Sequence, residues 1–309
     1  MSTPRNNSTK STVNSLTQDP EFQKTALYKC FQEKPLGFVD VGSLGGVHPL
    51  MNPAASLVHA LCFEPDKKAS RSLRRKYAKN SPFARVDVNP LALYSECGNG
   101  RKLFVCKTPT NTSLLEPDQN FIRRYKAKKF ELDHITDISA TTLDTVLGHI
   151  AHDRMGEFIK LDTQGSEYEI LKGASHVLND RCVGIWCEIE FFEIYKQQKV
   201  YADIDLLLRD YGLFIYGFYP RYRSTKTLSP KNHSSEERLW WADALFLKDP
   251  LVIRGIESAV LKLLCDSEAE DEKLESVASE LIGKGAKVQK SMLEIVGKPR
   301  TQAVLIKRG

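Results

Sequence analysis

The chain has 309 residues, a hydrophobic share of 41%, a charged share of 27% and a formal net charge of +5. These shares are typical of a soluble globular protein and exclude a fibrous or wholly disordered chain. No apolar run reaches the ~18 residues of a membrane span, the first residues contain no apolar stretch of a secretory signal, and the charge is too small to demand a nucleic-acid partner. We therefore expect a cytoplasmic protein with no membrane span and no nucleic-acid partner.

The composition changes along the chain and predicts a division into separate regions. Residues 1–20 are rich in Ser, Thr and Asn and lack apolar periodicity, which predicts a flexible N-terminal arm. Strand and helix patterns alternate over residues 21–250, which is the length of one large α/β domain. Residues 251–309 are helical in pattern and highly charged, so we expect a C-terminal helical extension. Its apolar stripe indicates packing on the main domain or a homodimer through the C-terminal helices.

Short apolar runs predict the strands of the main domain. The runs are GFVDVG (37–42), HALCFEPD (59–66), ARVDVNP (84–90), FIKLDTQG (158–165), VGIWCEIEF (183–191), LFIYGFY (213–219) and ALFLK (244–248). Helical patterns lie between them, and this alternation predicts a mostly parallel seven-stranded sheet with helices on both faces. Gly98 and Gly100 interrupt the alternation and predict an inserted hairpin within residues 93–116.

The cysteines and the basic clusters indicate which kinds of binding site the chain can form. Seven cysteines are spread along the chain without a CxxC pair, which argues against a disulfide framework and against a zinc site. We therefore predict no structural metal. Two basic clusters, residues 67–79 and 123–129, are typical of solvated helix faces, with phosphate contact as the alternative.

The segment VDVGSLGG (39–46) lies where a predicted strand meets a helix, the usual place of a nucleotide-binding turn. It fails the dinucleotide fingerprint GxGxxG, because Leu44 and Val47 occupy the second and third glycine positions. The carboxylate of Asp40 would repel a pyrophosphate but attract an ammonium or a sulfonium, and S-adenosylmethionine carries both. Glu64, at the end of the next strand, is placed to accept hydrogen bonds from a ribose diol. For the loop alone, an ordinary tight turn is the alternative.

The segment FIKLDTQGSEYEILKGA (158–174) closely resembles the motif of FkbM-type S-adenosylmethionine-dependent methyltransferases. In that motif a strand is followed by Asp, two residues, Gly, any residue and Glu, and later by Leu-Lys-Gly-Ala. Further pieces follow in the order of that family: VDVGSLGG, FEPD, the region from NPLALYSECGNGRKLFV to NTSLLEP, TTLDTVL, CEIEFFEIYKQQKVYADIDLLLRDYGL and WADALFLK. The resemblance covers about residues 28–248 and implies a Rossmann-like class I methyltransferase fold with S-adenosylmethionine as the cofactor.

The resemblance also implies roles for single residues. The residues implied to bind the cofactor are Asp40, Gly42 and Gly46 for the methionine part, Glu64 for the ribose, and Asp87 or its neighbours for the adenine. The sequence departs from the family at Leu44, where a polar residue is frequent, and at Gln164, where an acid commonly precedes the glycine. Any role of that acid in the family does not apply to this chain.

Methyl transfer to a hydroxyl needs an in-line arrangement of the reactants and either a proton acceptor or a metal ion. Asp162 and Glu188 follow neighbouring strands and are predicted to converge beside the methyl group, so we assign them as catalytic. They would share a proton, which raises one pKa, or hold a divalent cation such as Mg²⁺. Glu169 is typical of a helix N-terminus, where the dipole favours an acid, and Glu167 fits either role.

The leading hypothesis is O-methylation of a hydroxyl on a sugar, a glycolipid precursor or a secondary metabolite, so the expected partner is a small-molecule or glycan acceptor. N-methylation is the alternative within enzymes, because deprotonation of the acceptor is less demanding there. A degenerate binding module with the same fold is the alternative outside enzymes. The presence of Asp40, Gly42, Glu64 and Asp162 argues against that module.

Overall fold

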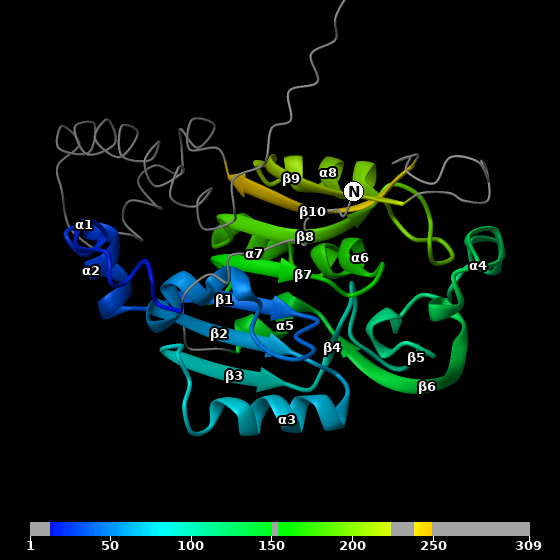
Figure 1. Cartoon of the computed structure of the whole chain (residues 1–309), viewed down its shortest axis with the longest axis horizontal. Helices are drawn as coiled ribbons and strands as arrows, with labels where there is room; N and C mark the ends of the chain where they lie inside the picture. Colours follow the sequence, from blue (N-terminus) through cyan, green and yellow to red (C-terminus); the bar gives the residue numbers. More distant parts are fainter. Residues whose placement is uncertain (1–12, 150–153, 224–237, 249–309) are drawn as a thin grey trace, which may run out of the picture.

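A seven-stranded sheet forms the centre of the molecule in the computed structural model, which describes residues 13–149, 154–223 and 238–248 (Figure 1). The strands are Leu36–Val41 (β1), Val58–Phe63 (β2), Arg85–Asn89 (β3), Phe158–Leu161 (β7), Gly184–Glu190 (β8), Leu213–Arg223 (β9) and Arg238–Lys248 (β10). Their spatial order is β3-β2-β1-β7-β8-β10-β9. Pairing is parallel except at β10, which is antiparallel to both of its neighbours. The predicted mostly parallel sheet is confirmed.

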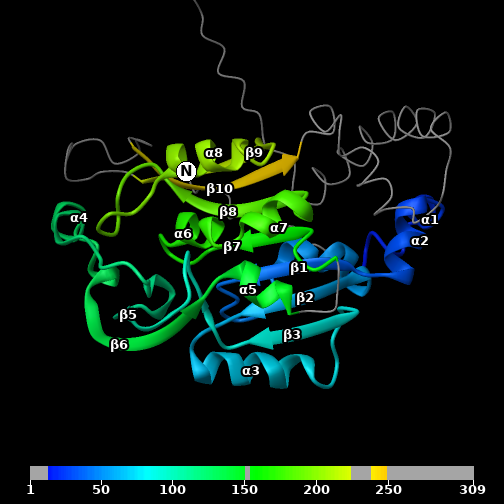
Figure 2. The same ribbon diagram turned by 180° about the vertical axis from the view of Figure 1, so that it is seen from behind.

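Helices cover both faces of the sheet, as the alternating pattern predicts (Figure 2). One face packs against Leu143–Gly148 (α5), Glu167–Lys172 (α6), Ser175–Asp180 (α7) and Tyr201–Arg209 (α8). The other face packs against the 3-10 helix Pro49–Leu57 (η1) and the helix Lys67–Tyr77 (α3). Strands β1 and β2 are buried on both faces, which explains why they read as nearly continuous apolar runs.

A second, smaller sheet lies beside the ends at which the parallel strands finish (Figure 1). Its strands are Ala92–Leu93 (β4), Gly98–Cys106 (β5) and Leu132–Thr141 (β6), in the order β4-β6-β5. The predicted hairpin within residues 93–116 is wrong, because β5 contains both glycines and pairs with β6. Most side chains of β6 are exposed, so no apolar run marks this strand in the sequence. Between β5 and β6 lie Pro109–Asn111 (η2), Gln119–Tyr125 (α4) and Lys128–Phe130 (η3).

The described N-terminal residues contact η1. The backbone N–H of Asn14 donates to the carbonyl of Asn52 at 2.8 Å, and the side chain of Asn14 accepts from the N–H of Ser56 at 2.7 Å. Two helices follow, Pro20–Gln23 (α1) and Ala26–Glu33 (α2). Part of the predicted arm is therefore joined to the domain by hydrogen bonds.

The predicted helical extension from residue 251, and with it the predicted dimer surface, lies outside the described residues. The three-region division of the chain stays a prediction. None of the helices in the described ranges has the length and apolar character needed to cross a membrane.

Candidate active site

The end of β7 forms a tight turn that presents Asp162. Gly165 has φ +103°, and a Cβ there would lie 2.8 Å from the ring of Tyr195, so only glycine fits without displacement. Glu167 holds the turn, since its carboxylate accepts from the N–H of Thr163 at 2.6 Å and from the N–H of Gly165 at 2.8 Å. Glu167 is 2% exposed. Of the two roles left open by the sequence, its contacts match the structural one.

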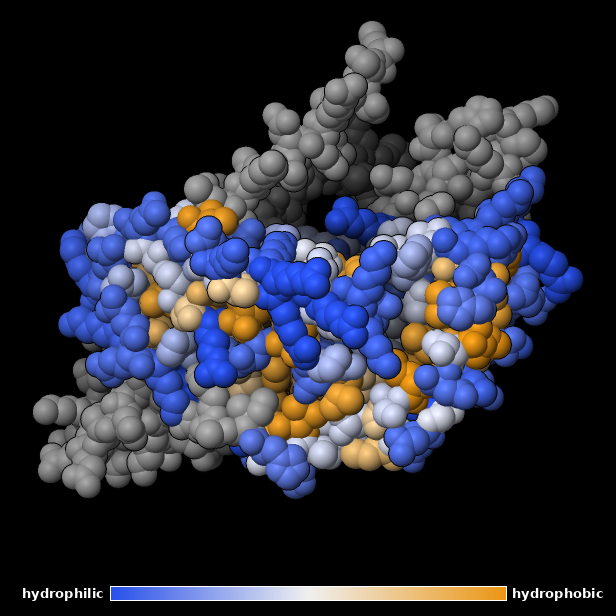
Figure 3. Space-filling view, turned by 90° about the horizontal axis from the view of Figure 1, so that it is seen from below, coloured by the Kyte–Doolittle hydropathy of each residue, from blue (hydrophilic) through white to orange (hydrophobic). Residues whose placement is uncertain are grey.

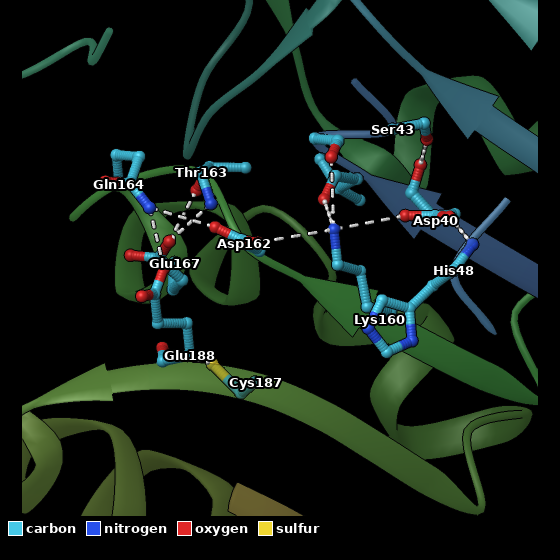
Figure 4. Close-up of polar contacts among 12 residues, drawn as sticks. Asp40, Ser43, His48, Lys160, Asp162, Thr163, Gln164, Glu167, Cys187 and Glu188 are labelled. Carbon is cyan, nitrogen blue, oxygen red and sulfur yellow. Dashed lines mark hydrogen bonds and ion pairs between the residues drawn. The ribbon is translucent and has the colours of Figure 1, made fainter. Parts of the chain in front are cut away.

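Gln164 joins the two predicted catalytic acids. Its backbone is in the left-handed region with φ +61°, and its side-chain Nε2 donates to Asp162 Oδ1 at 3.0 Å and to Glu188 Oε2 at 2.7 Å (Figure 4). Its carbonyl accepts from the Ser113 hydroxyl at 2.7 Å. Asp162 and Glu188 are thus brought together, and an amide stands between them at the position where the family commonly has an acid.

The two acids have opposite pKa shifts. Burial opposes ionisation of Asp162, but the charge of Lys160 and hydrogen bonds from Glu188 and Gln164 outweigh it and lower the pKa of Asp162. Burial raises the pKa of Glu188 well above its ordinary value, and the charges of Asp162 and Glu190 add to this effect. The pair therefore holds its proton on Glu188 and its charge on Asp162.

Lys160 is a member of the site that the sequence reasoning does not single out. Its amine lies 3.3 Å from Asp40 Oδ1 and 3.8 Å from Asp162 Oδ2, and it donates to the carbonyls of Val41 and Gly42 (Figure 4). Burial alone would lower its pKa, but Asp40 and Asp162 outweigh burial and raise it. The strands explain the contact, because Asp40 and Lys160 are register partners on β1 and β7. The one signal in the sequence is a lysine inside an apolar strand.

The glycine loop packs tightly on β7. Gly42 has φ +79°, and a Cβ at this position would lie 2.0 Å from the carbonyl oxygen of Asp162. Asp40 is fully buried beneath the loop, where its Oδ2 accepts from the N–H of His48 at 2.7 Å. From the other side, the Tyr77 hydroxyl accepts from the N–H of Val47 at 2.9 Å. Asp40, Gly42 and Asp162 are therefore neighbours, as their positions in the sequence predict.

Glu64 and Asp87 lie at different depths of the sheet. Glu64 directly follows β2, accepts from the N–H of Asp66 at 2.9 Å, and has a pKa raised by burial. Asp87 lies in the middle of β3 and bonds to His59 at 2.7 Å and to Arg85 at 2.9 Å. Glu64 lies at the end of β2, as the sequence predicts. The carboxylate of Asp87 instead contacts His59 on β2 and Arg85 on its own strand. Its predicted role near the adenine stays a prediction.

A cavity of about 560 Å³ adjoins Asp162 and the glycine loop. Lys160 and Asp162 line it, together with His48 and with Lys76 and Tyr77 of α3. Burial and the charge of Lys160 lower the pKa of His48, and its ring centroid lies 6.0 Å from that of Trp186. The cavity thus has polar and partly aromatic walls and lies next to the predicted site of methyl transfer.

Metal ligation is the other role considered for the acids. Within residues 13–149, 154–223 and 238–248, no group of three or more His, Cys, Asp or Glu side chains is arranged to hold a metal ion. The predicted divalent cation stays a prediction. Gln164 Nε2 occupies the space between the carboxylates of Asp162 and Glu188 and bonds to both.

Comparison with known proteins places the chain in a family. The profile of the Methyltransferase FkbM domain matches residues 52–214, which is more than half of the chain. No curated protein sequence matches the chain.

Three solved structures have weak similarity to the chain. Methyltransferase FkbM from Methylobacillus flagellatus KT is 15% identical, with 69% of this chain and 43% of that chain covered and a TM-score of 0.39, so the match spans less than half of that protein. Magnesium protoporphyrin IX methyltransferase from Synechocystis PCC 6803 is 10% identical, with 77% and 85% covered and a TM-score of 0.36. M. jannaschii TYW2 is 10% identical, with 73% and 78% covered and a TM-score of 0.33. The family profile is the finding that assigns the chain: it belongs to the FkbM methyltransferase family.

Proposed function

We propose that this protein transfers a methyl group from S-adenosylmethionine to a hydroxyl of a small-molecule or glycan acceptor. The observation that carries the proposal is the pair Asp162–Glu188. Asp162 directly follows β7, Glu188 lies within the neighbouring strand β8, and Gln164 joins the two next to the glycine loop. The pKa of Asp162 is lowered and the pKa of Glu188 is raised. A pair with pKa values pushed apart is typical of acid–base catalysis.

Asp40, Gly42, Gly46 and Glu64 are the proposed cofactor residues. Gly42 allows the loop to approach β7, and the charges of the buried Asp40 and the partly exposed Asp162 favour a ligand that carries an ammonium and a sulfonium. Lys160 neutralises part of this negative charge. Glu64 is nearly buried at the end of β2, where a carboxylate can accept from both hydroxyls of a ribose.

In the proposed reaction the acceptor oxygen attacks the methyl carbon while the bond from that carbon to sulfur breaks. The electron pair of the broken bond remains on sulfur, which becomes a neutral thioether. Glu188 first releases its own proton to solvent, and the resulting carboxylate then takes the proton of the acceptor hydroxyl. Its raised pKa makes Glu188 the stronger base of the pair. Asp162 remains charged and would stabilise the sulfonium of a bound cofactor.

The acceptor is proposed to enter the cavity beside the glycine loop. Hydroxyl, amide and amine groups of Tyr77, Asn80 and Lys76 line this cavity together with Phe83, a mixture that suits a sugar unit or a hydroxylated secondary metabolite. A glycolipid precursor fits the same chemistry through its sugar. N-methylation is the second candidate, since an amine acceptor would need Asp162 only as a hydrogen-bond acceptor.

Titration calorimetry and a labelled-methyl assay test this proposal. The full-length protein should bind S-adenosylmethionine, and Asp40→Ala and Glu64→Ala should each weaken binding by about 10-fold or more, since a charged hydrogen bond contributes about 1.5 to 3 kcal/mol. Extracts incubated with the enzyme and methyl-labelled cofactor should yield a labelled, alkali-stable product whose methyl group is on oxygen. Folded protein that does not bind the cofactor would contradict the whole proposal, and a product labelled on nitrogen would replace O-methylation by N-methylation.

A further inference from the structure

The outer face of α3 carries a dense set of cations. Residues 67–79 contain seven basic residues, and no acid occurs between residues 67 and 86. These residues are Lys67, Lys68, Arg71, Arg74, Arg75, Lys76 and Lys79, all exposed. Arg74 and Lys76 donate to the carbonyls of Val88 and Gly45, but none of the seven has an ion pair among the residues that the structure describes.

The arrangement of these charges is unfavourable for an isolated helix. Lys67, Arg71, Arg75 and Lys79 follow one another at a spacing of four residues, so like charges are neighbours along one stripe. α3 is instead held by the Asp66 cap and by Leu73, which is buried against the sheet. α3 is the lowest element in Figure 1 and faces the viewer in Figure 3, where strongly hydrophilic side chains cover the middle of the surface.

The same chain contains an acidic segment of matching size. Residues 266–280 include seven acids and a single basic residue. The acids are Asp266, Glu268, Glu270, Asp271, Glu272, Glu275 and Glu280. The segment lies outside the described residues, so its sequence alone enters the argument. Its charge is opposite to that of residues 67–79 and of similar magnitude.

We propose that the acidic segment 266–280 docks on the cationic outer face of α3 in the same chain. An external polyanion would have to compete with a partner that is tethered to the protein. A tether of this length keeps the segment at an effective concentration on the order of mM. Charge complementarity within one chain therefore favours the segment over an external ligand.

The connecting chain is long enough for this contact. β10 ends at Lys248, five strand positions from β3 in the sheet order, which is about 24 Å at ~4.8 Å per strand. α3 packs beside β3. Residues 249–265 provide 17 connecting residues, whose reach is about 56 Å if extended and about 26 Å if helical. The extended reach exceeds the distance to α3, whereas the helical reach about equals the width from β10 to β3, so the contact needs a connection that is at least partly extended.

Zero-length carbodiimide cross-linking of the full chain tests the proposal, because this reagent joins lysine amines to carboxylates in direct contact. Lys67, Lys68 and Lys79 should yield cross-links to peptides of residues 266–280 that outnumber those of the exposed Lys128 by at least five-fold. The excess should vanish at about 1 M salt, where the Debye length is about 3 Å. An equimolar mixture of ¹⁴N and ¹⁵N protein distinguishes contacts within one chain from contacts between copies.

Charge reversal gives the second readout. Arg71→Glu with Arg75→Glu should lower the cross-links of Lys67 and Lys79 by five-fold or more, and Glu270→Arg with Glu272→Arg in the same chain should restore them. Arg123→Glu with Arg124→Glu on α4 is the matched control and should change nothing. Circular dichroism of each variant verifies that the fold is kept.

Several outcomes would overturn the proposal. These are equal cross-linking of all exposed lysines, reversal variants with unchanged cross-links, and cross-links found only between labelled and unlabelled copies. Binding of phosphatidylserine vesicles or of a single-stranded oligonucleotide through Arg71 and Arg75, without cross-links to residues 266–280, would assign the face to an external polyanion. The proposed methyltransferase activity is measured separately and does not depend on any of these results.

Discussion

At the scale of single residues, the site combines groups that sequence reasoning identifies with groups that it misses. Asp162 and Glu188 are predictable because acids at strand ends of a parallel sheet converge on one rim. Lys160 is not, because its importance depends on the register that places it opposite Asp40. The bridging role of Gln164 is equally hidden, since it requires a left-handed backbone and a side chain that turns back toward two acids.

Asp162→Asn and Glu188→Gln should each lower kcat by about 100-fold or more, the usual scale for losing a general base or its partner. Both variants should fold, and Glu188→Gln should keep its affinity for S-adenosylmethionine. Glu169→Gln in the next helix is the control and should retain wild-type turnover. If EDTA abolishes wild-type activity and Mg²⁺ restores it, the pair acts through a metal ion rather than as a proton acceptor.

Glu190→Gln should shift the pH–rate profile to lower pH. The charge of Glu190 raises the pKa of Glu188, so removing it allows Glu188 to deprotonate and act as a base at lower pH. Stability gives an independent check, because burial raises the pKa of Glu190 well above its ordinary value. The wild type should lose stability as pH rises from the ordinary glutamate range through that raised pKa, and the variant should lose less, because only the raised pKa of Glu188 and of the other buried acids then contributes. Identical profiles and identical melting curves would refute the coupling.

Lys160→Met should destabilise the fold by about 3 to 5 kcal/mol, because it leaves the buried carboxylate of Asp40 without a cation. Combining it with Asp40→Asn should recover part of the loss, since the uncompensated charge is then gone. Urea unfolding monitored by tryptophan fluorescence measures both effects. Additive losses in the double variant would show that the two residues act independently.

At the scale of elements, the large sheet is predictable and the small one is not. Buried parallel strands such as β1 and β2 have apolar runs that mark them in the sequence. β6 is ten residues long but mostly exposed, and its partner β5 begins with the glycines that suggest a turn. The register between these strands is set by tertiary contacts that local propensity cannot encode.

The small sheet contributes to the proposed site, because the segment after β5 contacts the turn of residues 162–165. The Ser113 hydroxyl donates to the carbonyl of Gln164, and Tyr195 bonds to Gln164 and to the carbonyl of Asn111. Ser113→Ala combined with Tyr195→Phe should therefore lower kcat by about 10-fold while leaving cofactor affinity within two-fold of wild type. Ser139→Ala, on the exposed side of β6, is the matched control. A loss of cofactor affinity instead would place these contacts in the cofactor site.

At the scale of the whole molecule, cofactor binding should stabilise the fold. A ligand at 100 times its Kd adds about 2.7 kcal/mol, which corresponds to a melting temperature about 5 to 10 °C higher for a domain of this size. Asp40→Ala, which weakens binding by about 10-fold or more, should reduce that shift to about half or less at the same ligand concentration. Asp87→Ala tests whether the adenine lies near β3. No shift for the wild type at saturating S-adenosylmethionine would contradict the proposed cofactor.

The pairing of β1 with β7 has a consequence for how the protein folds. The amine of Lys160 bonds to the carbonyl of Val41, 119 residues earlier in the chain. Contacts between such distant residues require closure of a long loop, so folding should be slow compared with that of a helical bundle of equal length. During synthesis, Asp40 can gain its cation, Lys160, only after β7 has left the ribosome. Until residue 160 has emerged, burying Asp40 would leave its carboxylate without a cation, so the earlier strands should not fold stably. Premature termination before residue 160 should therefore yield fragments that chaperones retain and proteases remove.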